Sequence, residues 1–497
     1  MSETTMPNWL MQRAKLTPDR VAVETENDTV SFLTLYQQVT EIARQLWSIG
    51  VRENDKVAFI SRNSLELVRF YHALAAVGAV GVPLNNRLSA GEQSWQLEDS
   101  CAKWLICDEH FQSRGLEIMK GKSSVSFLTM AQVRDQPQAE ARLQNEFDLD
   151  KPCTIIYTSG TTGNPKGVIL TYGNHWWSAA GSMLNLGLET ADKWLCCVPL
   201  FHVSGLSILM KNVIYGMPIV LQEKFNPREA NRFIYEEGVT MISVVANMLK
   251  RMLEDLGDRK YPESFRCMLL GGGPVPQPLL SRCVEKRIPV FQTYGLTETA
   301  SQMVTLTPEF MFEKAGSAGK PLFPGRVRIV GSGKDLNPGE AGEIVVKGLN
   351  VTPGYWRRPE ATNKAIRDGW LFTGDIGYLD QDGFLYVLDR RKDLIISGGE
   401  NVYPAEIESV LLGHPSVDEA GVIGVKDDTW GQVPYAFVKV KDGFHFSEEE
   451  ILDYCRKYLA KYKLPRHVQR IDCMPRNASR KLMRRKLSDF LPEPFID

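Results

Sequence analysis

The feature that most restricts the fold of this 497-residue chain is a short apolar run, residues 154–157, that leads directly into a loop of glycines and hydroxyls. The loop, residues 158–167, reads TSGTTGNPKG. Its glycines let the backbone approach a ligand closely, and its N–H groups, hydroxyls and lysine together make a cradle for polyphosphate. A Walker A loop needs Gly-Lys-Ser/Thr in that order, so this is a different kind of phosphate loop. A flexible surface linker is the alternative, but a linker would not combine this composition with Pro-Lys-Gly and flanking strands.

Short apolar runs alternate with helical patterns over most of the chain. Residues 57–60 and 80–82 read as strands, and Ser64 is placed to cap a helix over 65–77 between them. This order of strand, helix and strand predicts parallel α/β layers, as does a further buried strand at 268–270 that runs into glycines. Ligand sites in such sheets lie beyond the carboxyl ends of the strands, where both glycine-rich loops fall.

The pattern changes after about residue 320, where segments such as 343–346 indicate a β-rich region. A charged segment, DRRKD at 389–393, follows, and we place a domain boundary there. Beyond it, Pro404 begins one helical pattern and Ser447 begins another that runs toward Tyr462. The expected fold class is α/β: a large N-terminal domain of parallel-type α/β subdomains plus a β-rich subdomain, with a small, mobile α+β C-terminal domain. The predicted domains are 1–389, a hinge at 390–393, and 394–497.

Charge and cysteine content exclude several classes of protein. The formal net charge of -2 gives no overall electrostatic attraction to nucleic acid or anionic membranes. Nine cysteines are scattered without a C-x-x-C pair, which indicates reduced thiols and a cytoplasmic setting. The sequence has no H-E-x-x-H or Cys/His spacing typical of a zinc site, no apolar run long enough to cross a bilayer, and no signal-peptide pattern at its start.

The loop at 158–167 resembles the phosphate loop of the adenylate-forming superfamily, which includes acyl-CoA synthetases, peptide-synthetase adenylation domains and luciferases. Three further motifs resemble motifs of that family and follow one another in the same order as in the family. GGGP at 271–274 resembles the loop that packs against adenine, and TGD at 373–375 resembles the motif whose aspartate binds the ribose. YGLTE at 294–298 resembles the motif whose threonine contacts the α-phosphate and whose glutamate helps to hold Mg²⁺. Each of these three alone would pass for an ordinary turn. The nucleotide-binding residues that the resemblance implies are Thr158, Ser159, Gly160, Thr161, Thr162, Gly163, Lys166, Gly272, Gly273, Tyr294 and Asp375.

The motifs around the predicted boundary extend the resemblance. The DRRKD segment resembles the family hinge, in which Arg390 reaches the nucleotide and Lys392 is the hinge position. The SGGEN segment that follows resembles the loop along the thiol tunnel and supplies Gly398 and Gly399. A solvent-facing turn would have the same composition as this loop.

The last motif, PRNASRKLMR at 475–484, resembles the segment that carries the catalytic lysine, here Lys481. Relatives often have glycine just before that lysine, whereas this chain has Arg480, so we expect a loop with less backbone freedom. The Pro-Arg-Asn start and the arginines after the lysine keep the register of the motif.

The resemblance implies a ligase that uses ATP to turn a carboxylate into an acyl-adenylate and then passes the acyl group to a thiol, with Mg²⁺ as cofactor and coenzyme A as co-substrate. Attack on the α-phosphorus needs charge neutralisation and alignment more than a protein nucleophile. The expected catalytic residues are Lys481, Thr297, Glu298 and His202, and Glu298 is the expected Mg²⁺ ligand. Because Lys481 is far in sequence from the phosphate loop, we expect the small domain to close for adenylation. The expected partners are a small carboxylic acid, ATP and CoA.

Local resemblances indicate the acid. PLFHVSG at 199–205 resembles the family segment at the mouth of the acyl pocket, where His202 is either a pocket residue or a packed core histidine. The start of the chain at 6–14 and TETASQ at 297–302 resemble the o-succinylbenzoate–CoA ligases of menaquinone synthesis. That substrate is an aromatic keto acid with two carboxylates. His202 and Ser301 are candidate donors for the carboxylate that is not activated.

Four alternatives remain open from the sequence. Another aryl- or medium-chain fatty acyl-CoA synthetase would want an apolar floor in the acyl pocket. A free-standing adenylation enzyme that loads a carrier protein would be insensitive to free CoA. A luciferase-like oxygenase would consume O₂, and a non-catalytic nucleotide-binding regulator would release no pyrophosphate.

Overall fold

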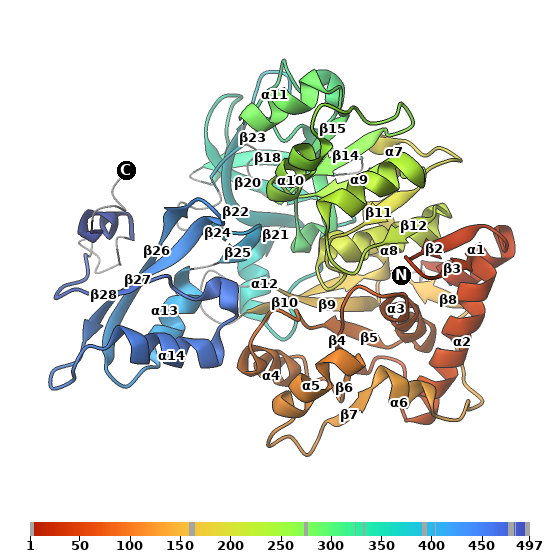
Figure 1. Ribbon diagram of the computed structural model, residues 1–497, viewed down its shortest axis with the longest axis horizontal. Coiled ribbons are helices and arrows are strands. Elements are labelled where there is room, and N and C mark those ends of the chain that lie inside the picture. Colours follow the sequence, from red (N-terminus) through yellow and green to blue (C-terminus); the bar gives the residue numbers. More distant parts are fainter. Residues whose placement is uncertain are drawn as a thin grey trace. The chain divides into compact units, whose positions relative to one another are not determined.

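The structure is a computed structural model, shown in Figure 1. It describes residues 4–158, 165–272, 277–323, 325–331, 333–389, 395–402, 404–475, 482 and 484–492. The chain forms two compact units. The first consists of Met1–Asn86, Asp99–Ile156 and Gly167–Leu388, and the second consists of Arg87–Glu98, Tyr157–Lys166 and Asp389–Asp497.

A six-stranded sheet with the order β10-β9-β5-β4-β6-β7 carries the strand that leads into the phosphate loop. Its strands are β4 (Lys56–Ile60), β5 (Val80–Pro83), β6 (Trp104–Cys107), β7 (Ser126–Thr129), β9 (Pro152–Thr158) and β10 (Lys166–Thr171). Strand β4 pairs in parallel with β5 and β6. Helix α3 (Leu65–Val77) connects β4 to β5, and Ser64 Oγ caps it by accepting the Leu67 N–H at 3.1 Å. The predicted strand–helix–strand unit is therefore confirmed.

A nine-stranded sheet with the order β17-β16-β15-β14-β13-β11-β12-β2-β3 forms the centre of the first unit. Its strands are β2 (Val21–Glu24), β3 (Thr29–Ser31), β11 (Trp194–Cys196), β12 (Ile219–Leu221), β13 (Met241–Val244), β14 (Cys267–Leu270), β15 (Val290–Leu296), β16 (Ser301–Leu306) and β17 (Lys320–Pro321). Both faces are buried, as parallel strands require. Trp194 and Cys196 of β11 face one core, and Leu195 between them faces another.

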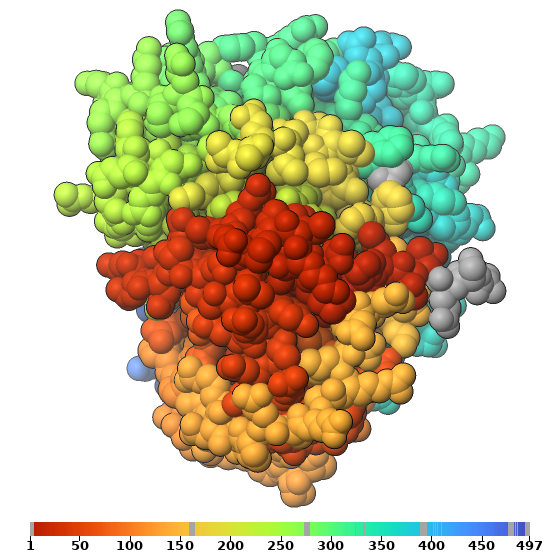
Figure 2. All heavy atoms as spheres, turned by 90° about the vertical axis from the view of Figure 1, so that its right-hand side faces the viewer, coloured from red at the N-terminus to blue at the C-terminus, as the bar shows by residue number. Residues whose placement is uncertain are grey.

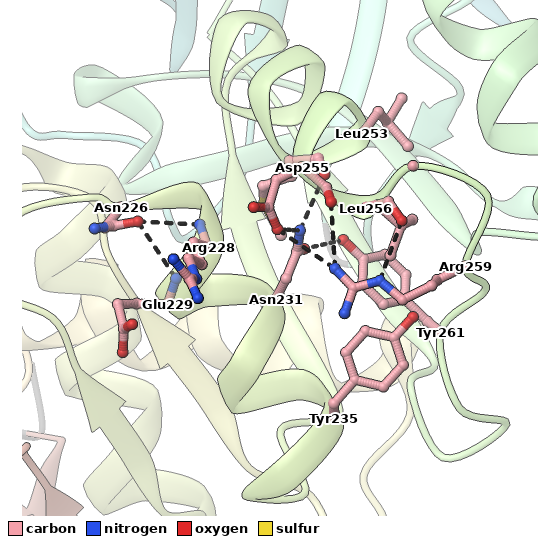
Figure 3. A network of polar contacts seen from close by, with 12 residues as sticks. Asn226, Arg228, Glu229, Asn231, Tyr235, Leu253, Asp255, Leu256, Arg259 and Tyr261 are labelled. Carbon is pink, nitrogen blue, oxygen red and sulfur yellow. Dashed lines mark hydrogen bonds and ion pairs between the residues drawn. The ribbon is translucent and has the colours of Figure 1, made fainter.

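Helices cover both faces of this sheet. Those packed in the first core include α7 (Tyr172–Leu186) and α8 (Val203–Tyr215), and those in the second include α9 (Pro227–Glu236), α10 (Ala246–Leu256) and α11 (Gln277–Glu285). A polar network pins α9 to α10, as Figure 3 shows. In it, Asn231 Nδ2 donates to Met252 O at 3.0 Å and to Asp255 Oδ2 at 2.7 Å, while Tyr261 Oη donates to Asn231 Oδ1 at 2.6 Å.

The N-terminal residues join the two sheets. Strands β2 and β3 extend the nine-stranded sheet, and α2 (Phe32–Ser48) then packs against α1 (Trp9–Leu16) and α3 before the chain enters β4 of the other sheet. Figure 2 shows this segment in red, with orange residues on one side of it and yellow and green residues on the other. The remaining elements of this region are β1 (Thr5–Pro7), α5 (Gln112–Ile118), α6 (Met130–Arg134) and β8 (Glu146–Asp148). Helix α4 (Ala90–Asp99) belongs to the second unit except for its last residue.

A third, antiparallel sheet confirms the β-rich region predicted after about residue 320. It has the order β19-β18-β20-β22-β21, with β23 paired to β22. Its strands are β18 (Arg326–Gly331), β19 (Lys334–Asp335), β20 (Gly342–Lys347), β21 (Ile366–Arg367), β22 (Trp370–Leu379) and β23 (Leu385–Asp389), and α12 (Pro359–Ala365) precedes β21. Tyr294 of β15 packs with Ile344 and Leu371 in the core beneath this sheet.

The second unit is α+β, as predicted. Its strands are β24 (Ile395–Ser397), β25 (Glu400–Val402), β26 (Val417–Asp427), β27 (Gly431–Val440) and β28 (Val468–Arg470), and its helices include α13 (Pro404–Leu412) and α14 (Glu448–Tyr458). The Ser447 hydroxyl caps α14 by accepting the Glu450 N–H. The prediction that this helix runs toward Tyr462 was too long. Leu459 adopts an extended conformation because it and the next residue turn into the core, where Leu459 is buried.

A buried lysine lies at the centre of the second unit. Lys463 Nζ contacts Glu406 Oε1 at 2.6 Å and Glu92 Oε1 at 2.9 Å. Burial lowers the pKa of this lysine, but the two carboxylates outweigh burial and raise it. Lys463 is therefore a charged residue whose charge is fully compensated.

Stability of the first unit depends on a buried ion pair beside β11. Arg266 Nε donates to Asp192 Oδ1 at 2.7 Å, and Thr240 Oγ1 donates to the same oxygen at 2.9 Å. Burial raises the pKa of Asp192, but hydrogen bonds from Arg266 and from the Glu189 backbone outweigh it, so the pKa lies below its usual value. The stabilisation is thus present above the unfolded-state pKa and is lost as pH falls through the folded-state value.

We expect Asp192→Ala to lower the free energy of unfolding by roughly 3 kcal/mol at neutral pH, because it removes the buried carboxylate to which Arg266 and Thr240 donate hydrogen bonds. Denaturant unfolding measures the change. Glu53→Ala is the control, since its pair with Lys151 is about half exposed on both sides and contributes about 1 kcal/mol or less. Equal losses in the two variants would contradict the importance of the buried pair.

Candidate active site

A tight reversal of the chain between β15 and β16 forms the centre of the candidate site. A single 3-10 turn, Thr297–Thr299, joins the two antiparallel strands. A Cβ added at Gly295 would lie 1.8 Å from Ser301 O, so only glycine fits at this position. Ala300 and Ser301 have φ of 51° and 101°, which is unusual for residues that carry a side chain. The turn thus holds the YGLTE motif and the residues after it in one fixed shape.

Tyr294 and Asp375 come together beside this turn. Tyr294 Oη donates to Asp375 Oδ2 at 2.7 Å, and both side chains are buried. Gly374 has φ of 75°, which turns the backbone of β22 just before the aspartate. Its N–H donates to Glu343 Oε1 at 2.9 Å, and the Asp375 N–H donates to Thr373 Oγ1 at 3.1 Å. One oxygen of Asp375 is therefore oriented by the protein.

Glu298 occupies the turn itself and is half-buried. Tyr355 Oη donates to Glu298 Oε1 at 3.0 Å, and the Thr352 N–H donates to Glu298 O at 2.7 Å. The Trp356 N–H in turn donates to Gly167 O at 2.7 Å, which ties this segment to the chain that follows the phosphate loop. Thr297, at the start of the turn, accepts the Ala300 N–H through its backbone oxygen.

The carboxylate of Glu298 fits a magnesium site of the kind that ATP brings with it. Mg²⁺ commonly takes one or two protein carboxylates and completes its shell with phosphate oxygens and water. The described part of the chain has no group of three or more His, Cys, Asp or Glu side chains that could hold a metal ion by themselves. A single half-buried carboxylate held by a tyrosine is consistent with shared coordination.

The glycine-rich loop after β14 begins as predicted beyond the carboxyl end of a buried strand. Gly271 N–H donates to Val244 O at 3.1 Å, and Gly272 has φ of 87°. A Cβ at Gly271 would lie 3.0 Å from the Thr293 side chain, so the loop passes close to β15. Gly272 thus has a conformation that glycine adopts without strain.

Several predicted site residues lie outside the described residues. They are Ser159, Gly160, Thr161, Thr162, Gly163, Gly273, Arg390 and Lys481, and the hinge at 390–393 lies outside as well. In the second unit, Thr158 ends β9 and Lys166 begins β10. Gly398 and Gly399 join β24 to β25 with φ of 58° and 85°, and Gly398 N–H donates to Trp430 O at 2.9 Å.

The acyl segment 199–205 leads into α8. His202 is the residue before the helix, is half-buried, and has its ring 4.6 Å from that of Phe201. A turn farther along, Ser207 Oγ lies 3.3 Å from Ser301 Oγ. Ser301 therefore contacts α8 through the hydroxyl of Ser207.

Lys211 was missed in the sequence and lies on the same face of α8, one turn after Ser207. It is 1% exposed, and its Nζ donates to Gln302 Oε1 at 3.0 Å. Burial lowers the pKa of Lys211 to about 7. The sequence feature that could have indicated this residue is a single lysine in the largely apolar run SGLSILMKNVIY. Lysine is almost never fully buried in a protein unless it is paired.

The fold and the site define an adenylate-forming enzyme. The model of the AMP-binding enzyme family matches residues 10–356, and that of the AMP-binding enzyme C-terminal domain matches residues 406–481. The chain therefore belongs to the AMP-binding enzymes, which confirms the superfamily that the phosphate loop indicated.

Relatives that match over the full length of the chain are more specific than the family models. The 2-succinylbenzoate–CoA ligase of Geobacillus kaustophilus is 57% identical over 490 residues, which cover 99% of each chain. A solved structure of o-succinylbenzoate CoA synthetase from Bacillus subtilis, a double mutant bound to the product analogue OSB-NCoA, is 49% identical with a TM-score of 0.94 and covers 98% of this chain and 99% of that one. The same enzyme in complex with ATP and magnesium ion is 49% identical, with a TM-score of 0.77 over 98% and 100%.

We expect Tyr294→Phe to raise the KM for ATP about 10-fold, because one hydrogen bond to the Asp375 carboxylate is lost while the packing of the ring stays. Steady-state kinetics with ATP as the varied substrate measures this change. Tyr378→Phe on the same strand as Asp375 is the control, since that ring stacks on Tyr386 with centroids 4.8 Å apart. An unchanged KM in Tyr294→Phe would exclude a nucleotide role for the Tyr294–Asp375 pair.

Proposed function

We propose that the chain is an AMP-forming acid–thiol ligase that converts o-succinylbenzoate to its acyl-adenylate, with release of pyrophosphate, and then to its CoA thioester, with release of AMP. The full-length identity of 57% to a 2-succinylbenzoate–CoA ligase carries this assignment. The resemblance places this thioester in menaquinone biosynthesis. The substrates are the acid, ATP and CoA, and Mg²⁺ accompanies ATP.

The first half-reaction requires charge neutralisation around the α-phosphate. ATP and Mg²⁺, when bound, supply the AMP leaving group and a hard cation that shares coordination with Glu298. Thr297 contacts the α-phosphate, and the lysine at 481 bridges the substrate carboxylate and the α-phosphate as a compact positive charge. The segment 158–163 and Lys166 hold the outgoing phosphates through N–H groups, hydroxyls and an ammonium.

The nucleoside part of ATP is held by residues of two sheets. Asp375 accepts hydrogen bonds from the ribose hydroxyls, and the hydrogen bond from Tyr294 orients its carboxylate. Gly272 and Gly273 form the loop against which adenine packs, where a side chain would obstruct the approach of a flat base. Arg390 reaches the nucleotide from the hinge.

In this proposal the chain is divided into two domains, 1–389 and 394–497, which together carry out the two half-reactions. The segment 390–393 is the hinge about which the small domain moves, so that Lys481 acts in adenylation and Gly398 and Gly399 line the path of the thiol afterwards. This assignment extends the resemblance of the DRRKD and SGGEN segments.

The second carboxylate of o-succinylbenzoate is bound at α8 and β16. Lys211 supplies the positive charge, since it is buried and its oxygen partner among the described residues is a neutral amide. Ser301 supplies a hydroxyl beside it, and His202 lies at the start of the same helix and is a further donor. A monocarboxylate would leave this buried cation without a counter-charge, which is costly.

A cytoplasmic location is supported by the cysteines. All nine lie within the described residues and are free thiols, and seven of them are buried. No helix in the described part of the chain is long and apolar enough to cross a membrane.

The first test is pyrophosphate release with a panel of acids: o-succinylbenzoate, benzoate, 4-coumarate, octanoate and palmitate, each with and without CoA. We expect a strong preference for o-succinylbenzoate and turnover that depends on CoA. Preference for octanoate or palmitate would favour a fatty acyl-CoA synthetase, and turnover indifferent to CoA would favour an enzyme that loads a carrier protein.

The role of Lys211 has a separate test. Lys211→Met keeps the volume of the side chain and removes its charge, so we expect the KM for o-succinylbenzoate to rise about 10- to 100-fold, as for the loss of a hydrogen bond between charged groups. Lys193→Met is the matched control, because that lysine directly precedes β11 and already pairs with Glu24 at 2.7 Å. An unchanged KM in Lys211→Met would remove Lys211 from the site.

A further inference from the structure

The environment of Lys211 is unusual because a buried cation has a neutral oxygen as its partner. Its Nζ lies 3.0 Å from Gln302 Oε1 and 5.0 Å from the centre of the Trp194 ring. Within the described residues, no carboxylate lies at ion-pair distance from it. Lys463 is also buried, and it contacts two carboxylates. Among the residues that the structure describes, Lys463 thus has anionic partners, whereas Lys211 has none.

Gln302 is itself fixed by contacts that determine which end of its amide faces the lysine. Its Oε1 also accepts a hydrogen bond from Ser182 Oγ at 2.7 Å, so this oxygen has two donors. Its Nε2 donates to Thr305 Oγ1 at 3.3 Å, and Thr305 Oγ1 in turn donates to Thr293 Oγ1 at 3.1 Å. Because Oε1 faces donors and Nε2 faces an acceptor, a flipped amide would break contacts at both ends. The side chain is 2% exposed.

An amide and a carboxylate of the same size would have opposite effects here. An amide oxygen orients the ammonium through a hydrogen bond but leaves its positive charge in place. A carboxylate would hold the ammonium equally well and would cancel the charge. A substrate carboxylate can form a strong ion pair with Lys211 only in the first case, because a cation that is already paired with one anion attracts a second anion weakly.

We propose that Gln302 is a positioning and specificity-determining residue, whose amide holds Lys211 in place and keeps its positive charge available for the second carboxylate of the acid substrate. This inference rests on the proposed function, in which Lys211 binds that carboxylate. Gln302 acts through Lys211 and contacts no reacting atom. Gln302 and Ser301 are neighbours on β16. The same strand therefore provides a hydroxyl for the substrate carboxylate and the amide that positions the ammonium group of Lys211.

The main test is Gln302→Glu, which changes one atom and brings a carboxylate to the lysine. The measurement is kcat/KM for o-succinylbenzoate relative to the mono-acid that keeps the activated carboxylate and lacks the second one. We expect the preference for the diacid to fall about 10- to 100-fold, through a higher KM for the diacid. A preference within 2-fold of the unaltered enzyme, in a folded variant, would overturn the inference.

A second variant keeps the inference testable if Gln302→Glu does not fold. Gln302→Leu removes the acceptor, which further lowers the pKa of Lys211 because the charged form loses its hydrogen bond. The titratable group that faces Lys211 from β14 is Cys267, and burial raises the pKa of that thiol to about 12, so it stays neutral.

In the unaltered enzyme, binding of the second carboxylate needs charged Lys211, so kcat/KM for the diacid falls as pH rises through the pKa of this lysine. We expect Gln302→Leu to move this fall to lower pH, with recovery toward the unaltered value at about pH 6. A profile that does not move, with the same loss at every pH, would indicate a purely structural role and would overturn the inference.

Two comparisons separate this inference from its premise. In a Lys211→Met background, Gln302→Glu should no longer change the diacid preference, because the charge it cancels is gone. If Lys211→Met alone leaves the KM for the diacid unchanged, the proposed role of Lys211 fails; if it raises that KM and Gln302→Glu does not, the role of Gln302 alone fails.

The matched control is Asn231→Asp, which makes the same change of amide to carboxylate in the buried network between α9 and α10 of Figure 3. Its Nδ2 contacts Asp255, so the variant should unfold at lower temperature while the diacid preference stays within 2-fold. A fall in preference like that of Gln302→Glu would attribute the effect to loss of stability and overturn the inference.

Discussion

The tight reversal between Gly295 and Ser301 is the constraint on which both halves of the site depend. Gly295 cannot carry a side chain because Ser301 O occupies that space, and the chain returns through two residues with positive φ. Tyr294 and Glu298 before the reversal bond to Asp375 and Tyr355, while Ser301 and Gln302 after it contact α8. A rigid turn of this kind keeps a fixed spacing between the proposed nucleotide-binding residues and the proposed acid site.

Two lysines that are buried in the described part of the chain have opposite electrostatic environments. Lys463 lies between Glu92 and Glu406, and this pairing raises its pKa despite burial. Lys211 has an amide for a partner, and burial lowers its pKa to about 7. The first arrangement leaves no uncompensated lysine charge at this position of the second unit. The second leaves a charge that a dicarboxylate can pair with, which is the property that a selective acid site needs.

The elements around the site hold it by ordinary backbone and packing forces. The nine-stranded sheet is buried on both faces, so β14 and β15 have little freedom. The antiparallel sheet adds Asp375 through the turn at Gly374, and the segment before α12 adds Tyr355. Residues from three separate stretches of sequence thus meet at one turn.

Local sequence determined the secondary structure and the chemistry of the site to a large extent. The helix cap at Ser64 and the strand–helix–strand pattern around it could be predicted, because caps and hydrophobic periodicity depend on a few neighbouring residues. The phosphate loop and the YGLTE motif were readable because they are contiguous, and their order indicated the family. The end of α14 was misjudged because the burial of Leu459, which ends the helix early, is a tertiary effect. The pairings of Tyr294 with Asp375, Tyr355 with Glu298 and Gln302 with Lys211 join residues 81, 57 and 91 positions apart. Only the tertiary structure could decide them, since nothing in a local pattern states which distant side chain will satisfy a buried polar group or leave a buried charge unpaired.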